Sequence, residues 1–295
     1  MTKRRVILKH FKKLIHDIVC CMYSERTEKR GRKDKYSIWF YIKYIVQVLV
    51  NGTPWNKLSC TCDPSTIKKK FYKWNSMNVF YIAYVLLLDE YYEYSDAIKI
   101  LFIDSTTIEN QNCSECVGYT YKLKGKKATK ITTVIDSNKM TLAHQISKPS
   151  IHDVNMIQTS TQGVIETIKP TYHDPLYIVG DKGYISKDIK DELRKKNAKK
   201  KKYNYTYENK PLKERYRIEA SYSHLKKQYG RIKLLKDSKI STYNTFLLMG
   251  LTNQFLNYFA KHHQLTKIHK KCIVNVHTMA EKITKNSSLI DSYFF

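Results

Sequence analysis

Acidic residues are scarce in this chain of 295 residues, where 26 Asp and Glu stand against 53 Lys and Arg and leave a formal net charge of +27. An excess of this size exceeds what solubility requires and predicts a polyanionic partner, most simply the phosphates of nucleic acid. A basic surface that only faces solvent is the alternative. The apolar fraction of 42% predicts a folded core rather than disorder.

Long apolar runs are also missing. The longest, at 44–50 and 81–88, are too short to span a bilayer, and the basic start of the chain lacks the apolar core of a signal peptide. We therefore expect a soluble, intracellular, DNA-associated protein with no membrane partner, in the cytoplasm or nucleoid, or in the nucleus of a eukaryotic host.

Cysteines number seven, an odd count that argues against a secreted disulfide framework. Cys60 with Cys62, and Cys113 with Cys116, offer four thiolates for zinc, but the separation of the two pairs is not a familiar zinc-finger spacing. Reduced, partly buried thiols are the interpretation that we favour.

The first 95 residues predict a helical domain. An apolar-periodic stretch at 37–50 is followed by a helix that starts at Pro64, with Asp63 as its N-cap. The apolar face of this helix carries Ile67, Phe71 and Trp74. Four lysines lie largely off this face, namely Lys68, Lys69, Lys70 and Lys73, of which Lys68, Lys69 and Lys73 are the predicted DNA contacts. This pattern resembles a helix-turn-helix DNA-binding unit, and a small helical bundle with a solvated lysine face explains it equally well.

From about residue 98 the pattern changes to strands and helices in alternation. We expect a strand at 98–108, two strands within 128–147, a helix at 153–169, a strand at 176–180, and helices at 186–197, 212–232 and 242–263. This order predicts an α/β domain with a mixed sheet.

Three carboxylates stand out in this second part. Asp104 follows the first apolar strand, Asp181 follows a later one, and Glu219 borders the apolar face of the helix at 212–232. Strand ends in an α/β domain meet at one crevice, and gathered carboxylates repel one another unless a divalent cation is present. Two Mg²⁺ or Mn²⁺ ions about 4 Å apart are a standard device for phosphoryl transfer, which indicates a nuclease or a strand-transfer enzyme.

Three blocks, "FIDSTTI" with Asp104, "VGDKGY" with Asp181 and "YRIEASYSHLKKQYGRI" with Glu219, closely resemble those of the DDE transposases of bacterial insertion sequences. "KKATKITTVIDSNKM", "KPSIHDVNMI" and the N-terminal region fit as well, so the resemblance covers roughly 30–259. Gly180 stands where the family usually has Ala or a similar small residue. The segment 113–127 has no clear counterpart.

The resemblance implies an RNase H-like mixed five-stranded sheet flanked by helices, behind an all-α helix-turn-helix-like domain. The expected domains are 1–95 for DNA binding, 96–263 for catalysis and 264–295 as a tail. The implied catalytic and metal-binding residues are Asp104, Asp181 and Glu219, with two Mg²⁺ or Mn²⁺ ions. The implied activity is cut-and-paste transposition of terminal inverted repeats into target DNA, by a homodimer or larger assembly on the DNA.

Several further residues receive expected roles. Lys130, Lys182, Lys226 and Arg231 are predicted to contact DNA, although Lys182 could equally face solvent. His152 precedes Asp153, which we expect to be an N-cap rather than a metal ligand, and Trp55 and Tyr184 are expected to pack. Two alternative functions remain: a domesticated, non-catalytic DNA-binding protein, and an RNase H-like nuclease without strand transfer.

Overall fold

The structure is a computed structural model of the whole chain. It describes residues 3–24, 34–51, 53–95, 98–110, 114–171, 173–174, 176–181, 184, 191, 195, 198–200, 219, 240–262 and 265–285. The chain divides into two compact units. One comprises Met1–Tyr94 and Gln228–Asn286, and the other comprises Ser95–Lys227 and Ser287–Phe295.

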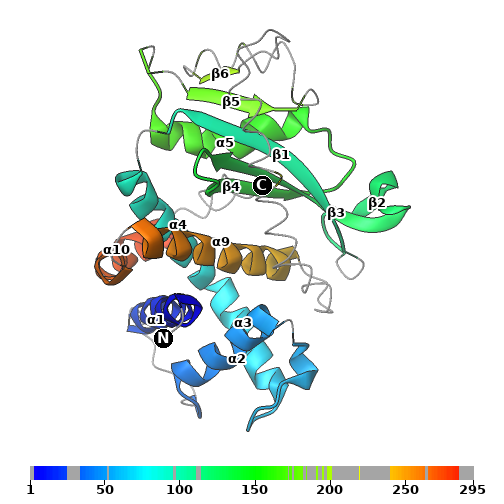
Figure 1. Cartoon of the computed structure of the whole chain (residues 1–295). Coiled ribbons are helices and arrows are strands. Elements are labelled where there is room, and N and C mark those ends of the chain that lie inside the picture. Colours follow the sequence, from blue (N-terminus) through cyan, green and yellow to red (C-terminus); the bar gives the residue numbers. More distant parts are fainter. Residues whose placement is uncertain are drawn as a thin grey trace. The chain divides into compact units, whose positions relative to one another are not determined.

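The first unit is helical in its described parts (Figure 1). Its helices are α1 (Lys3–Ser24), α2 (Ile38–Asn51), α3 (Pro64–Ser76), α4 (Val79–Tyr94), α9 (Ile240–His262) and α10 (Leu265–Lys285), with a short 3₁₀ helix η1 (Trp55–Lys57). Helix α4 is apolar on nearly all sides, and it packs against α1, α3, α9 and α10. A helix that is apolar all round belongs in the interior, so α4 forms the centre of this unit.

Helix α3 has the start and the apolar face that its sequence predicts. Asp63 is the N-cap, and its side chain accepts a hydrogen bond from the Ser65 backbone N–H at 2.8 Å, with Pro64 in the first turn. The residues Ile67, Phe71 and Trp74 are fully buried. Trp55 on η1 is buried as well, and its ring lies 5.3 Å from that of Phe71.

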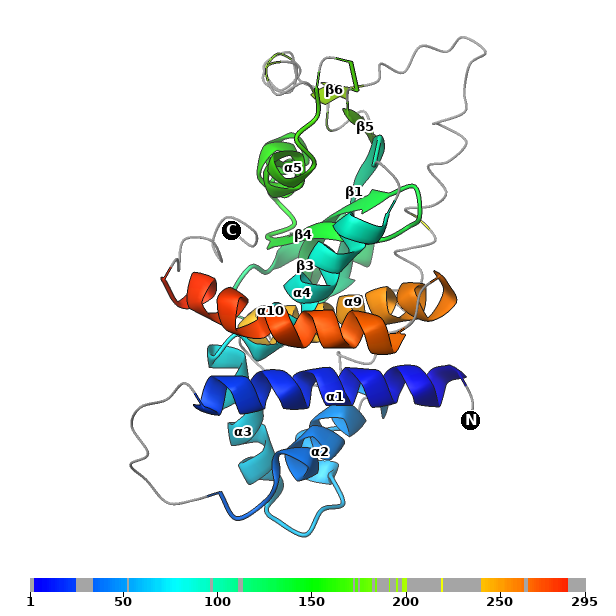
Figure 2. The ribbon, with the colours of Figure 1, turned by 90° about the vertical axis from the view of Figure 1, so that its left-hand side faces the viewer.

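The segment that the sequence leaves as a tail contains helix α10. Its buried residues Leu265, Ile268, Cys272 and Val276 recur at helical spacing, so this helix covers its partners with one apolar stripe. Helix α10 runs alongside α1 in Figure 2, and it also packs on α4. Helix α9 packs on α1 and α4 in the same way. The functional boundaries 1–95, 96–263 and 264–295 remain predictions.

The second unit contains a mixed sheet of β1 (Ile100–Glu109), β2 (Gly118–Thr120), β3 (Lys126–Asp136), β4 (Thr141–Ser147), β5 (Leu176–Gly180) and β6 (Ala198–Lys200). Strands β1, β3 and β4 pair antiparallel, whereas β1, β5 and β6 pair parallel. The order β4-β3-β1-β5-β6 is the expected five-stranded RNase H-like sheet. The short β2 also pairs with β3, which makes the sheet six-stranded.

Helix α5 (Val154–Ile168) packs against β3 and β4 on one face of this sheet. Ile157 and Thr161 of α5 are fully buried, as are Thr132 and Val134 of β3, which lie on the face of the sheet that α5 covers. The sheet and α5 therefore share one core.

Strand β1 lies close to the strand expected at 98–108. Asp104 was expected to follow the apolar part of this strand, but it lies inside β1, because β3 pairs with β1 as far as the pair Glu109 and Ala128. The parallel pairing with β5, in contrast, ends at Ile103 and Gly180. Asp104 thus lies within β1, at the point where its parallel neighbour stops.

Within the described ranges, no helix combines the length and the apolar character that crossing a membrane requires.

Candidate active site

The pairing of β1 with β5 brings two of the three predicted acids together. Ile103 and Gly180 form the last parallel pair, and Asp104 and Asp181 are the next residues on the two segments. Neighbouring strands lie about 4.8 Å apart, and matched residues of parallel strands share a face. Asp104 is half-buried and Asp181 is exposed. Two acidic residues therefore lie on adjacent segments, each one residue past the last parallel pair of β1 and β5.

Local hydrogen bonds hold each acid. The Asp104 carboxylate accepts a hydrogen bond from the Ser105 backbone N–H at 2.8 Å. The Tyr184 backbone N–H donates to the Asp181 carbonyl oxygen at 3.0 Å, which closes a turn directly after β5. Tyr184 itself is 1% exposed, so the turn is anchored by a buried ring.

The pKa of the Tyr184 hydroxyl depends on the charges around it. Burial raises the pKa of its hydroxyl well above the usual range, and the negative charges of Asp153, Asp104 and Asp181 raise it further, against a hydrogen bond with Ser105 that lowers it. Three carboxylates thus act on one buried hydroxyl. A cation beside Asp104 and Asp181 would offset this negative potential.

The third acid is not brought to this pair by the part of the chain that the structure describes. Glu219 is an exposed residue in helical conformation. Among the described residues, no group of three or more His, Cys, Asp or Glu side chains lies close enough to hold a metal ion. Lys182, Lys226 and Arg231 lie outside the described residues. The roles of these four residues stay predictions.

A polar network lies on the face of β1 that α5 covers. The Ser105 hydroxyl donates to Asp153 at 2.9 Å, lies 3.0 Å from the Thr132 hydroxyl, and makes a short hydrogen bond with the Tyr184 hydroxyl. Lys130 pairs with Asp153 at 3.0 Å and donates to the Ile151 carbonyl oxygen. These contacts join the start of α5 to β1, to β3 and to the turn that follows β5.

This network changes two expectations from the sequence. Asp153 occupies the N-cap position of α5, but its side chain makes no capping hydrogen bond because it binds Ser105 and Lys130 instead. Lys130 is 8% exposed, which favours a structural role for its ammonium group. Its contact with DNA remains a prediction. Tyr184 packs as expected, and its hydrogen bond to Ser105 was not anticipated.

The predicted DNA-contacting lysines of α3 divide by exposure. Lys69 and Lys73 are exposed, and Lys68 is half-buried, with its ammonium group 5.5 Å from the centre of the Tyr72 ring. Lys70 is buried and forms an ion pair with Asp34 at 2.6 Å, so it does not belong to the exposed lysine face that the sequence suggests.

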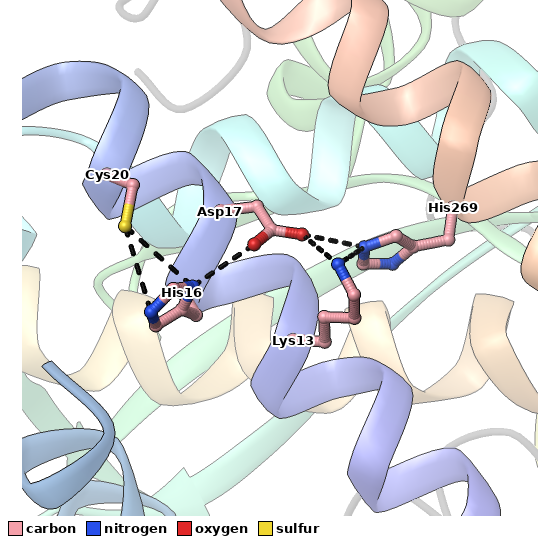
Figure 3. Close-up of polar contacts among 5 residues, drawn as sticks. All are labelled: Lys13, His16, Asp17, Cys20 and His269. Carbon is pink, nitrogen blue, oxygen red and sulfur yellow. Dashed lines mark hydrogen bonds and ion pairs between the residues drawn. The ribbon is translucent and has the colours of Figure 1, made fainter. Parts of the chain in front are cut away.

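A second polar cluster lies between α1 and α10 of the helical unit (Figure 3). Asp17 contacts Lys13 at 2.7 Å, His269 at 2.9 Å and His16 at 3.1 Å. Burial raises the pKa of Asp17, but the hydrogen bonds with Lys13, His269 and His16 outweigh it and leave the pKa below its usual value. Burial lowers the pKa of His269. The hydrogen bond between His269 and Asp17 therefore joins α10 to α1.

This cluster has no sign of a reactive thiol. The Cys20 sulfur lies 3.7 Å from His16, and burial, followed by the charge of Asp17, raises the pKa of Cys20, which disfavours the thiolate. No local signal in the sequence predicts the cluster, because Asp17 and His269 are 252 residues apart. The zinc interpretation also stays unsupported by geometry: the Cys60 thiol donates to the Cys62 carbonyl oxygen at 3.0 Å, and Cys113 lies outside the described residues.

The family model for the transposase DDE domain matches residues 96–252, which is just over half of the chain. The chain belongs to the DDE transposase family. Asp104, Asp181 and Glu219 of this transposase all lie within the matched range, as does the RNase H-like sheet.

Solved structures of Mos1 mariner transposase are similar to this transposase at low identity. Its catalytic domain is 14% identical with a TM-score of 0.31, over 74% of this chain and 95% of that chain. Its paired-end complex with Mn is 12% identical with a TM-score of 0.33, over 89% and 82% of the two chains. These TM-scores lie below 0.5, so the family assignment rests on the family model. No curated protein matches the chain.

Proposed function

We propose that this DDE transposase cleaves DNA at the terminal inverted repeats of a mobile element and joins the freed ends to target DNA. The observation that carries the proposal is the register that sets Asp104 beside Asp181 where the parallel pairing ends. Glu219, from the block that most closely resembles the family, would complete the acidic set. Insertion-sequence origin belongs to the same proposal.

Asp104, Asp181 and Glu219 would hold two Mg²⁺ or Mn²⁺ ions. Carboxylate oxygens are the hard ligands that these ions prefer. The pKa of Tyr184 is raised first by burial, and the negative charges of Asp153, Asp104 and Asp181, which the ions would offset, raise it further. When bound, the ions stabilise negative charge on the attacking and leaving oxygens. The three acidic residues would therefore bind the ions and orient them toward the DNA. The turn at Tyr184 keeps Asp181 next to β1.

The proposed reaction has two steps, hydrolysis and strand transfer. In the first, water attacks the phosphorus, the bond from phosphorus to the 3′ oxygen breaks, and that oxygen takes up a proton to become a 3′-hydroxyl. In the second, this hydroxyl attacks a phosphorus of the target strand, and the 3′ oxygen of the target leaves and takes up the proton. Both steps need the same acids and no other reactant than water and DNA.

Exposed basic residues of both units support DNA as the partner. Lys69 and Lys73 are exposed on α3. In the sheet unit, the hairpin of β2, the 3₁₀ helix η2 (Tyr121–Leu123) and the start of β3 exposes Lys124, Lys126 and Lys127 beside two tyrosines. Tyr119 is 71% exposed and Tyr121 is fully exposed, and exposed aromatic rings among lysines are typical of nucleic-acid contacts.

The position of this hairpin suits the same substrate. Strand β1 runs five residues from Asp104 to Glu109, whose partner Ala128 also pairs with Gly118 of β2. Five strand residues span about 17 Å, or roughly half a turn of duplex DNA. DNA held at Asp104 would therefore reach the hairpin. We extend the proposal to assembly of two or more protomers on paired DNA ends.

Cleavage of DNA that carries the sequences flanking the gene tests the proposal. With Mg²⁺ or Mn²⁺ the full-length protein should cut one strand, whereas Asp104→Asn and Asp181→Asn should lose at least a hundredfold in rate and keep DNA binding in a mobility-shift assay. Asp174→Asn is the matched control, because Asp174 is an exposed acid that pairs only with the exposed Lys99 in the described structure and should leave cleavage unchanged.

A second assay supplies a DNA end that already carries a free 3′-hydroxyl and measures its joining to a plasmid. Joining supports transposition, and cutting without joining identifies a nuclease. If the wild-type protein binds DNA but neither cuts nor joins with either metal, the chain is a non-catalytic binding protein and the proposal is wrong.

A further inference from the structure

The hydrogen-bonded network beneath the candidate active site links the two segments that carry Asp104 and Asp181. Ser105 directly follows Asp104 in β1, so its side chain points to the opposite face of the sheet, toward α5. Tyr184 closes the turn that holds the Asp181 carbonyl oxygen. The hydrogen bond between the Ser105 and Tyr184 hydroxyls therefore joins one acid-bearing segment to the other.

This link begins where backbone pairing ends. The last parallel pair of β1 and β5 is Ile103 with Gly180, and both acids lie one residue beyond it. Past that pair, the ladder no longer fixes the spacing of Asp104 and Asp181. There, the contact between Ser105 and Tyr184 holds the two segments together. Ser105 lies one residue after Asp104, and Tyr184 lies three residues after Asp181.

Counting donors gives the network a direction. A carboxylate only accepts, so Ser105 must give its single proton to Asp153 at 2.9 Å. The hydroxyls of Tyr184 and Thr132 then both donate to the Ser105 oxygen, which has two lone pairs. Asp153 is thus the acceptor on which the orientation of Ser105 depends.

Lys130 fixes this acceptor in turn. Its ammonium group lies 3.0 Å from the same Asp153 oxygen that Ser105 reaches, and it also donates to the Ile151 carbonyl oxygen just before α5. The contacts of Lys130, Asp153 and Ser105 lie on buried or half-buried groups, so water competes little with them.

We propose that Asp153 and Tyr184 are positioning residues of the transposase: acting through Ser105, they hold Asp104 and Asp181 at the spacing that divalent-metal binding requires. This inference rests on the proposed function, because it presumes that Asp104 and Asp181 bind the metal. Neither Asp153 nor Tyr184 contacts DNA or metal in this scheme. Removal of such a supporting partner costs roughly 10–100-fold in metal affinity or activity.

The test uses Tyr184→Phe and Asp153→Asn, which keep the size and shape of each side chain. Binding of Mn²⁺ to the full-length protein is measured by the electron paramagnetic resonance signal of the free ion, without DNA. Both variants should bind Mn²⁺ at least tenfold more weakly than wild type. Cleavage should need correspondingly more Mn²⁺, while KM for DNA stays within about twofold, because neither substitution touches the exposed lysines of α3 and of the β2–β3 hairpin.

Thr161→Val is the matched control, because it removes a buried hydroxyl of α5 that bonds only to the Ile157 carbonyl oxygen at 2.6 Å in the described structure. It should leave Mn²⁺ binding unchanged. Far-UV circular dichroism and thermal melting of each variant check folding. Since Tyr184→Phe and Asp153→Asn perturb the network from opposite ends, misfolding of one leaves the other as the test.

The two proposals fail in different ways. Asp104→Asn should abolish both Mn²⁺ binding and cleavage, and if it does neither, the proposed function is wrong. If Asp104→Asn is inactive while Tyr184→Phe and Asp153→Asn bind Mn²⁺ and cleave like the wild type, only the positioning role is overturned. An equal loss in Thr161→Val overturns it too, because the effect would then be general loss of packing.

Discussion

Gly180 is the position where one added methyl group should reveal how tightly the two acid-bearing segments are packed. A Cβ there would lie 2.8 Å from Ile103 Cγ2, 3.3 Å from the Ile103 carbonyl oxygen and 3.3 Å from Tyr184 Cδ2. Ile103 and Tyr184 are each 1% exposed, so neither has free space to move into. Gly180→Ala must therefore push β5 away from β1 directly before Asp181.

The magnitude follows from two opposing effects. Overpacking a close-packed core costs about 1–3 kcal/mol. Replacing Gly by Ala restricts the unfolded chain and returns about 0.4–1 kcal/mol. We expect Gly180→Ala to destabilise the sheet unit by about 1–2 kcal/mol net, and to slow DNA cleavage because the spacing of Asp104 and Asp181 changes.

Ile103→Leu is the compensating change. It conserves volume and removes the β-branch that carries Cγ2, at a cost below about 1.5 kcal/mol when made alone. In the double variant the clash is relieved, so the two changes should cost less together than the sum of the single ones, by about 1 kcal/mol in a double-mutant cycle.

Hydrogen exchange read by mass spectrometry is the suitable assay, because it resolves opening of β1 and β5 peptide by peptide. Tryptophan fluorescence would not report on this site: the three tryptophans, Trp39, Trp55 and Trp74, all precede residue 95. Equal protection of β1 and β5 in wild type and Gly180→Ala, or strictly additive effects of the two substitutions, would refute the packing argument.

Two further predictions concern the other regions. Burial lowers the pKa of His269 below 6.5, so its contribution to stability is complete above pH 6.5 and is lost as the pH falls below that value. Thermal melts followed by tryptophan fluorescence should show the helical unit weakening between pH 7 and 5. His269→Gln should reduce this dependence, and the part that remains is due to His10, whose pKa burial also lowers. The lowered pKa of Asp17 changes stability only below about pH 4, so its effect is separate from that of His269. A wild-type melting temperature that does not change between pH 7 and 5 would contradict the role of His269. In the β2–β3 hairpin, Lys127→Gln should reduce the slope of log K for DNA binding against log salt concentration by about one, and Tyr121→Ala should weaken binding. Lys99→Gln should change this slope less, because the Lys99 ammonium group already pairs with Asp174.

Local signals predicted the elements well. The N-cap Asp63 with Pro64, and the buried set Ile67, Phe71 and Trp74, were correct because capping and helical periodicity depend on residues a few positions apart. The apolar strand at 176–180 was correct for the same reason. The register that brings Asp104 to Asp181 was expected only from the general rule that strand ends meet.

Non-local contacts account for the rest. The position of Asp104 inside β1, rather than after its end, was not expected, because the pairing that runs on to Glu109 and Ala128 is made across the sheet and not along the chain. Asp153 looked like an N-cap because nothing in its neighbourhood reveals that Ser105 and Lys130 reach it from two strands. Lys70 looked like its exposed neighbours, because its ion-pair partner Asp34 lies 36 residues away in the sequence.

The packing of α10 against α1 also constrains the order in which a newly made chain can fold. Helix α1 leaves the ribosome before the sheet unit, and its partner α10 follows only after all the strands of that unit have been synthesised. Since domains fold as units during synthesis, the sheet can be complete while the helical unit still lacks α9 and α10. Translation of α9 and α10 is therefore the step that completes the helical unit. A chain that ended before α9 would retain Asp104, Asp181 and Glu219, but the apolar sides of α1 and α4 would be uncovered.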